Sequence, residues 1–142
     1  MNIIGKSIIA AAAYALLESI IGEEPLGIGN DNVFDDFLVY GSDYADTASL
    51  KRTITRNINT IVEDCDGFKI GKTGDPGNRA NAYRQYSAMY LLCRGSRSDI
   101  EVLEAYYNDK YHDHPRNDNQ RRGSAGIMSN SHHRYYLYVV VR

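Results

Sequence analysis

The sequence predicts an α+β fold in which a small, mainly antiparallel sheet of three strands is flanked by helices. Short apolar runs rich in tyrosine and β-branched residues predict the strands, at about residues 67–73, 87–94 and 134–141. Segments with helical spacing of apolar residues lie between these runs, and Gly, Pro and Asp clusters separate the elements. A chain of 142 residues has the size of one domain with a single core.

Residues 1–45 are predicted to form an acidic N-terminal extension that begins with an apolar helix. Residues 7–21 are alanine-rich and apolar, and a glycine follows them as a helix stop. The run is too short for a membrane span and contains Glu18. A helix that packs in the core or against a second copy of the chain is favoured over a signal peptide. Residues 22–46 predict an irregular connector with one short strand at 37–40.

Residues 46–142 are predicted to form the folded domain. Between residues 46 and 63, apolar side chains recur mainly three and four positions apart, which predicts an amphipathic helix. A strand at 68–72 follows, and a Gly-Asp-Pro-Gly turn then leads into a helix at about 78–85. The alternation of helix and strand predicts a sheet that helices cover.

The second half of this domain is predicted to contain a strand, a helix, a loop and a final strand. Residues 87–93 form a buried strand, and Ser98 with Glu101 matches a capping box that opens a helix running to about His112. A polar loop follows at 115–122, before a final strand rich in tyrosine and valine.

Charge is distributed unevenly along the chain. Residues 1–46 carry a net charge of -7, whereas residues 47–142 carry +5. This split favours a polyanionic partner for the basic part, although a solvated surface of mixed charge gives the same count. The two cysteines, Cys65 and Cys93, are too few for a disulfide framework, so a reducing compartment such as the cytoplasm is expected.

The Gly-Lys-Thr sequence at residues 71–73 does not belong to a phosphate-binding P-loop. A P-loop has four residues between its first glycine and Gly-Lys-Thr, whereas only three separate Gly67 from Gly71. A turn also follows Thr73 where the P-loop helix should begin. The sequence therefore predicts another function for this stretch.

The run FKIGKTGDPGNR at residues 68–79 resembles the second motif of the GIY-YIG nuclease superfamily and the arginine that follows it. The similarity is to the branch in which this motif reads KIGKT followed by Asp-Pro. Arg79 and Tyr83 match the family's arginine and the histidine or tyrosine four residues later. LEAYYNDKY at 103–111 resembles the helix that carries the family's metal-binding glutamate, which falls on Glu104.

The family's first strand, the GIY strand, is missing from its usual place before the second motif. The terminal segment HRYYLYVVVR has the expected character, so we expect a circularly permuted domain in which this strand still pairs with residues 68–72. Tyr138 would be the family's tyrosine, and Tyr136 is the alternative on the same face of the strand. A rival placement is LVYG at 38–41. Lys69 occupies the position of the YIG tyrosine and is counted with the candidate catalytic residues.

The resemblance implies a metal-dependent endonuclease of the kind found in viruses and mobile elements, with DNA as the expected substrate and RNA left open. Glu104 would hold Mg²⁺ or Mn²⁺, and Arg79 would bind phosphate oxygens. Tyr138 would deprotonate or orient the attacking water, while Tyr83 or Lys72 would assist near the metal or the leaving group. The residues support this independently, since Glu104 interrupts an apolar helix stripe where a purely structural helix would favour leucine.

Further polar residues after this helix suggest contacts to nucleic acid. Four histidines raise the option of zinc, but their spacing matches no Cys/His site: His112, His114, His132 and His133. The basic candidates for backbone contacts are His112, Arg116, Arg121 and Arg122. Two other functions stay open, namely an inactive member of the same fold that binds nucleic acid or protein, and an interaction protein that docks through the N-terminal helix.

Overall fold

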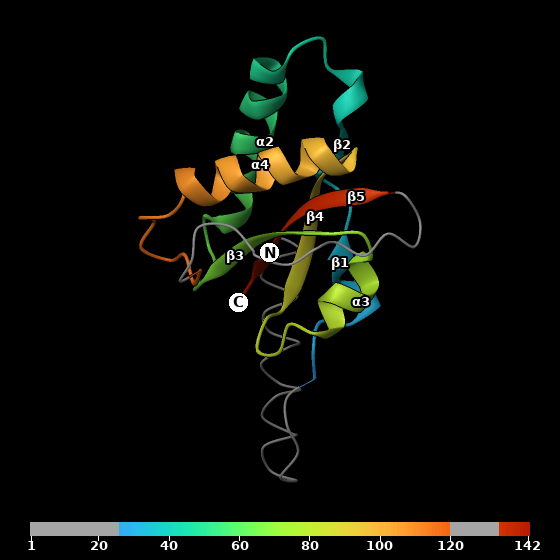
Figure 1. The fold of residues 1–142 in the computed structure, drawn as a ribbon. Helices are drawn as coiled ribbons and strands as arrows, with labels where there is room; N and C mark the ends of the chain where they lie inside the picture. The colour runs from blue at the N-terminus through green and yellow to red at the C-terminus, as the bar shows by residue number, and fades with distance from the viewer. Residues whose placement is uncertain (1–25, 120–133) are drawn as a thin grey trace, which may run out of the picture.

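A computed structural model describes residues 26–119 and 134–142 of the chain (Figure 1). The predicted N-terminal apolar helix, at 7–21, lies outside these residues, and with it the predicted contact between copies. Four site candidates also lie outside them: Arg121, Arg122, His132 and His133.

The described residues form an α+β fold around one sheet, which confirms the predicted fold class. The sheet has five strands rather than three, in the order β1-β4-β5-β3, with β2 also pairing with β4. The strands are β1 (Val33–Phe34), β2 (Val39–Tyr40), β3 (Phe68–Thr73), β4 (Ala88–Gly95) and β5 (Tyr135–Val141). The three predicted strands are β3, β4 and β5, and the two additional ones are only two residues long. The short strand predicted at 37–40 corresponds to β2, whereas β1 was not predicted, because two residues carry no periodicity.

The C-terminal strand β5 lies between β3 and β4 and is antiparallel to both. Its register places Val139 opposite Ile70 and Val141 opposite Phe68. The prediction that the tail pairs beside residues 68–72 is therefore confirmed. The rival segment at 38–41 is elsewhere, because β2 runs parallel to β4 at the other side of the sheet.

The segment at 26–45 was predicted to belong to a separate N-terminal extension, but it contributes β1 and β2 to this same sheet. Ile28 is buried beside α3 (Pro76–Asn81), and its backbone N–H donates to the carbonyl of Ala80 at 3.0 Å. Within the described ranges, no helix is long and apolar enough to span a membrane.

Two of the predicted helices form close to the expected places. Helix α2 (Thr47–Val62) begins after Asp46, whose side chain accepts a hydrogen bond from the Ser49 N–H at 2.6 Å. Helix α3 begins earlier than predicted, because Asp75 caps it and Pro76 stands in its first turn. It ends at Asn81 instead of about Gln85, and Gln85 adopts a left-handed conformation with φ of 71°.

Helix α4 (Arg97–Lys110) begins at a different cap from the one predicted. The side chain of Ser96, rather than that of Ser98, accepts the capping hydrogen bond, which Asp99 N–H donates at 3.2 Å. Glu101 instead pairs with Arg97 at 3.2 Å on the helix surface. The helix ends at Lys110, two residues before the predicted His112.

Helices cover both faces of the sheet. Figure 1 shows α2 and α4 crossing on one side, while α3 lies on the other. Alternate residues of β5 enter the two cores: Leu137 and Val139 pack with α2 and α4, whereas Tyr138 and Val140 pack on the side of α3. A strand buried on both faces is apolar at almost every position, which explains the run YLYVVV.

Candidate functional site

The ring of Tyr138 lies across the backbone of Gly71 on the side of the sheet that faces α3. The two residues are opposite each other in the β3–β5 ladder. A Cβ atom at Gly71 would overlap with the phenol ring and hydroxyl of Tyr138. Glycine is therefore required at this point of the edge strand, because only a residue without a side chain lets the phenol lie there. The Gly-Lys-Thr stretch thus makes room for a tyrosine instead of binding a nucleotide.

The hydroxyl of Tyr138 contacts the hydroxyl of Tyr83 at 2.5 Å. Tyr83 lies in the turn just after α3, where its N–H bonds to the carbonyl of Ala80. The two rings meet edge to face, with centroids 5.8 Å apart and an interplanar angle of 74°. The structure therefore brings together two of the predicted site tyrosines in one hydrogen-bonded pair.

Both tyrosines of this pair are in an environment that opposes ionisation. Burial raises the pKa of Tyr138 far above its ordinary value, and the neighbouring Tyr83 raises it further. Burial also raises the pKa of Tyr83, although the hydrogen bond from Tyr138 opposes this. Both phenols are consequently protonated at neutral pH and can donate as well as accept hydrogen bonds.

Glu104 and Lys72 form a buried ion pair on the opposite face of the sheet from the tyrosine pair, because Lys72 alternates with Gly71 along β3 and α4 covers that face (Figure 1). The Lys72 ammonium lies 3.7 Å from the Glu104 carboxylate, and the two side chains are only 10% and 2% exposed. A carboxylate buried in the middle of α4 is costly for a helix that serves only as structure, because its charge is taken out of water. The position of Glu104 on the buried face of α4 confirms that a charged group occupies the stripe between Leu103 and Tyr107.

Arg79 and Glu104 both act on the tyrosine pair. The guanidinium of Arg79 lowers the pKa of Tyr83 and of Tyr138, and the carboxylate of Glu104 raises both. The two charges come from opposite faces of the sheet, Arg79 from α3 and Glu104 from α4 (Figure 1). Arg79 itself is exposed, so its side chain is available to a ligand.

A buried amide network behind Glu104 was not anticipated from the sequence. Asn108 lies one turn further along α4, and its side-chain NH₂ donates to the Glu104 carbonyl at 3.0 Å. Asn119 donates to the Asn108 side-chain oxygen at 2.7 Å and to the carbonyl of Ile70 at 3.2 Å. It thereby ties the helix of Glu104 to strand β3. Asparagine in a polar loop is too common for its position to have signalled this role.

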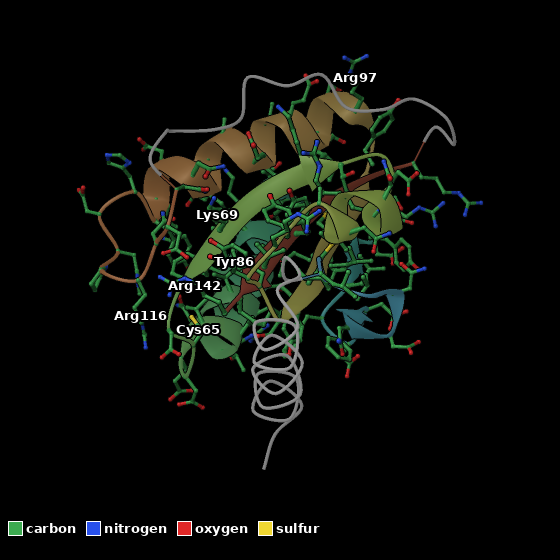
Figure 2. All side chains as sticks on the ribbon, turned by 90° about the horizontal axis from the view of Figure 1, so that it is seen from below. Cys65, Lys69, Tyr86, Arg97, Arg116 and Arg142 are labelled. Atoms are coloured by element: carbon green, nitrogen blue, oxygen red, sulfur yellow. The ribbon has the colours of Figure 1, made fainter. Side chains whose placement is uncertain are left out.

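Lys69 and Tyr136 border the tyrosine pair without joining its hydrogen bond. Lys69 is on the same face of β3 as Gly71, and its ammonium lies 5.7 Å from the centroid of the Tyr86 ring. Figure 2 shows Lys69, Tyr86 and Arg142 near one another at one end of the sheet. Tyr136 is half-buried and lies opposite Thr73.

Tyr86 and the C-terminal Arg142 are held together by Asp118. The Asp118 carboxylate accepts two hydrogen bonds from the Arg142 guanidinium, at 2.7 and 2.8 Å, and one from the Tyr86 hydroxyl at 2.8 Å. The contact with Arg142 lowers the pKa of Asp118. The Tyr86 hydroxyl is therefore already committed to a structural contact.

The candidates for backbone contacts are separate from the tyrosine pair. Arg116 donates to the carbonyls of Glu63 and Cys65, at 2.9 and 3.4 Å, and so caps the end of α2. His112 lies 4.0 Å from the carboxylate of Asp113. His114 packs against the Phe68 ring with centroids 5.0 Å apart, and burial lowers its pKa.

A divalent cation at Glu104 would have one carboxylate from the protein, which is only 2% exposed and is paired with Lys72. Mg²⁺ commonly uses one or two carboxylates and completes its shell with water and substrate oxygens. Glu104 supplies one such carboxylate, and a cation there would compete with Lys72 for it. Within residues 26–119 and 134–142, no group of three or more His, Cys, Asp or Glu residues could form a metal site made by the protein alone.

Comparison of the chain with protein families, curated proteins and solved structures finds no match.

Proposed function

We propose that this protein is a metal-dependent endonuclease of the GIY-YIG type that hydrolyses phosphodiester bonds, with DNA as the favoured substrate. The observation that carries the proposal is the contact between the hydroxyls of Tyr138 and Tyr83, with Arg79 on the neighbouring helix α3 and the buried Glu104 on α4. These four residues come from three separate elements and one turn, and they are the residues that the motif resemblance singles out. A tyrosine that served only for packing would need neither the arginine nor the glutamate.

The strand pairing supports the same proposal. β5 lies antiparallel beside β3, where the resemblance expects the GIY strand, and it delivers Tyr138 to Gly71. The chain reaches this position from its C-terminus, as a circular permutation requires. The polar network through Asn119 and Asn108 also fixes the helix of Glu104 against β3.

In the proposed reaction, the oxygen of a water molecule forms a bond to phosphorus and one P–O ester bond breaks. The proton released by the water ends on the leaving oxygen. Because both phenols are protonated, the Tyr83–Tyr138 pair orients the water instead of deprotonating it. Of the two roles predicted for Tyr138, orienting the water is therefore favoured over deprotonating it.

The charged residues would act on the phosphate. The exposed Arg79 can bind two phosphate oxygens through its planar guanidinium. Lys72, next to Glu104, can donate a hydrogen bond to the leaving oxygen as negative charge develops there. A divalent cation bound at Glu104 would supply a Lewis acid for the phosphate.

A binding module without catalytic activity is the second candidate. Lys69 replaces the tyrosine of the YIG motif, and the nearest alternative phenol, Tyr86, already donates its hydroxyl to Asp118. One hydroxyl that the family uses is therefore not supplied at this position. Such a protein would retain the phosphate contacts of Arg79 and lose hydrolysis.

A cleavage assay distinguishes these two functions. Single- and double-stranded DNA and RNA are incubated with the full chain in Mg²⁺, Mn²⁺ or chelator, and wild type is compared with Glu104→Gln and Arg79→Ala. Glu101→Gln is the matched control, because Glu101 is on the same helix but pairs with Arg97 at the surface. The nuclease proposal expects metal-dependent cleavage that both site variants lose and the control keeps.

Two outcomes would contradict it. Binding of nucleic acid without cleavage in any metal would favour the binding module. Cleavage that survives in Glu104→Gln would place the catalytic centre elsewhere in the molecule.

A further inference from the structure

A groove of about 930 Å³ lies between α2 and α4, on the side of the sheet opposite α3. None of its lining residues belongs to the tyrosine pair or its charged neighbours. The α2 wall is formed by positions three and four apart from Ala48 to Glu63, which is one face of the helix. Tyr106 and Lys110 of α4 form the opposite wall, and His114 and Arg116 close one end.

The groove is strongly basic. Among the described residues that line the groove, one is acidic, Glu63, and five carry a positive charge: Lys51, Arg52, Arg56, Lys110 and Arg116. Arg52, Arg56 and Lys110 are exposed to solvent. Because cations stand on both walls, a ligand in the groove would meet positive charge from two sides.

The floor of the groove is held in place by hydrogen bonds between the two helices. The Tyr107 hydroxyl contacts the Thr55 hydroxyl at 3.0 Å and donates to the Lys51 carbonyl at 2.8 Å. The Tyr111 hydroxyl donates to the Asn59 side-chain oxygen at 2.6 Å. These hydrogen bonds fix α2 and α4 relative to each other, so the helices that carry the cations need not become ordered when a ligand binds.

An exposed aromatic ring adds a second kind of contact. Tyr106 is 36% exposed, and the Lys51 ammonium lies 3.9 Å from the centroid of its ring. Because Lys51 covers one face of this ring, the exposed part of Tyr106 would contact a sugar or a base edge while the cations bind the phosphates. In the part of the chain that the structure describes, the other apolar lining residues are Ala48 and Val62, which offer an acidic peptide no large pocket for an anchoring side chain.

We propose that this groove, between α2 and α4, binds the sugar-phosphate backbone of nucleic acid at a site separate from the tyrosine pair. The α2 wall is about 22 Å long at 1.5 Å per residue, which corresponds to roughly six nucleotides of one strand. The site would hold the nucleic acid without reading its sequence, since phosphate contacts carry no base information. This proposal does not depend on hydrolysis at the tyrosine pair.

The test measures binding of labelled DNA and RNA oligonucleotides to the full chain by fluorescence anisotropy, with chelator present so that no cleavage occurs. Arg52→Gln and Arg56→Gln are combined, because both side chains are exposed and glutamine is a good helix former. Loss of two phosphate contacts should reduce the slope of log affinity against log salt by about two. The affinity itself should fall on the order of tenfold or more at moderate salt.

A matched control removes the same charge elsewhere. Arg94→Gln with Arg97→Gln also loses two positive charges, but Arg94 stacks over Tyr40 and Arg97 pairs with Glu101 outside the groove. Figure 2 shows Arg97 at the opposite end of the molecule from Arg116. The control variant should keep the affinity and the salt slope of wild type. In wild type and in the control, bound oligonucleotide should also protect Lys51 and Lys110 from chemical acetylation. This protection should be reduced in the groove variant.

Three results would overturn the proposal. The first is unchanged affinity and salt slope in the groove variant, and the second is an equal loss in the control variant. The third is displacement of the oligonucleotide by polyglutamate of similar length as effectively as by unlabelled oligonucleotide, which would make an acidic protein the partner. Absence of cleavage in any metal would contradict the nuclease proposal and leave the groove proposal standing.

Discussion

The hydroxyls of Tyr83 and Tyr138 lie 2.5 Å apart although 55 positions separate the two residues in the chain. Tyr138 reaches Tyr83 because β5 is inserted between β3 and β4 and because Gly71 leaves space for its ring. The contact therefore depends on the pairing of the tail with the second motif. Each of the following predictions tests one part of this arrangement or of the scaffold that holds it.

Replacing Gly71 with alanine should displace Tyr138 and reduce stability. The added Cβ would overlap with the phenol, and overpacking of this kind costs typically about 1–3 kcal/mol. The free energy of unfolding in urea measures the loss, and the cleavage assay should show loss of activity. Gly29→Ala is the matched control, because no atom of residues 26–119 or 134–142 lies within 4 Å of a Cβ added there. Equal effects of the two substitutions would show that the site at Gly71 is not specifically constrained.

Tyr138→Phe should remove cleavage while leaving most of the stability. The substitution keeps the ring in its place and removes one hydrogen bond, which contributes about 1 kcal/mol. The rate of cleavage should fall on the order of a hundredfold or more if the hydroxyl orients the water. Tyr136→Phe, on the same strand face but outside the pair, should cleave nearly as fast as wild type. A larger loss in the Tyr136 variant would transfer the role to that residue.

Substitutions of Glu104 and Lys72 should not have additive effects on stability. Glu104→Gln leaves the Lys72 ammonium, which is 10% exposed, without this carboxylate partner, and Lys72→Met does the reverse. Contacting charges typically couple by about 0.5–3 kcal/mol, so the double variant should lose less than the sum of the single variants. Urea unfolding of the four proteins gives the coupling. Additive losses would mean that the two groups do not interact in solution.

The contact between Asp118 and Arg142 should make stability depend on pH in the acid range. The hydrogen bonds from Arg142 hold the pKa of Asp118 below its ordinary value. The contact therefore stabilises the fold above the unfolded pKa, about 3.9, and this contribution is lost as the pH falls through the folded pKa. The difference in unfolding free energy between wild type and Asp118→Asn should be constant near neutrality and shrink below about pH 4.

The control for this pH dependence is Asp113→Asn. The Asp113 side chain is 99% exposed, so its replacement should leave the acid limb of the stability profile unchanged. A difference between wild type and Asp118→Asn that stayed constant down to the lowest pH would show that the carboxylate is not titrating in the folded state as described.

Two serine substitutions test whether Ser96 or Ser98 caps α4. Ser96→Ala removes the acceptor of the Asp99 N–H and should cost about 1 kcal/mol. Ser98→Ala lies within the helix and should change stability by less than about 0.5 kcal/mol. Thermal unfolding measures both. A larger loss of stability in Ser98→Ala than in Ser96→Ala would show that Ser98 is the cap.

The sequence by itself determined the elements whose signals are local. The spacing of Leu50, Ile54 and Ile58 is a property of neighbouring residues on one helix, and it predicted α2 to within a residue at each end. The strands at 68–73 and 135–141 were predicted for the same reason, since β-branched and aromatic runs favour extended backbone locally. The motif residues Arg79, Tyr83 and Glu104 could also be named, because their spacing along the chain carries the resemblance.

Only the tertiary structure decided how these parts combine. Alternation along a strand puts Tyr136 and Tyr138 on one face and cannot choose between them, whereas the register places Tyr138 opposite Gly71. The short strands β1 and β2 exist because β4 offers them backbone partners. The basic groove likewise requires α2 and α4 to cross. Each of these depends on hydrogen bonds and packing between residues far apart in the chain, which no local pattern specifies.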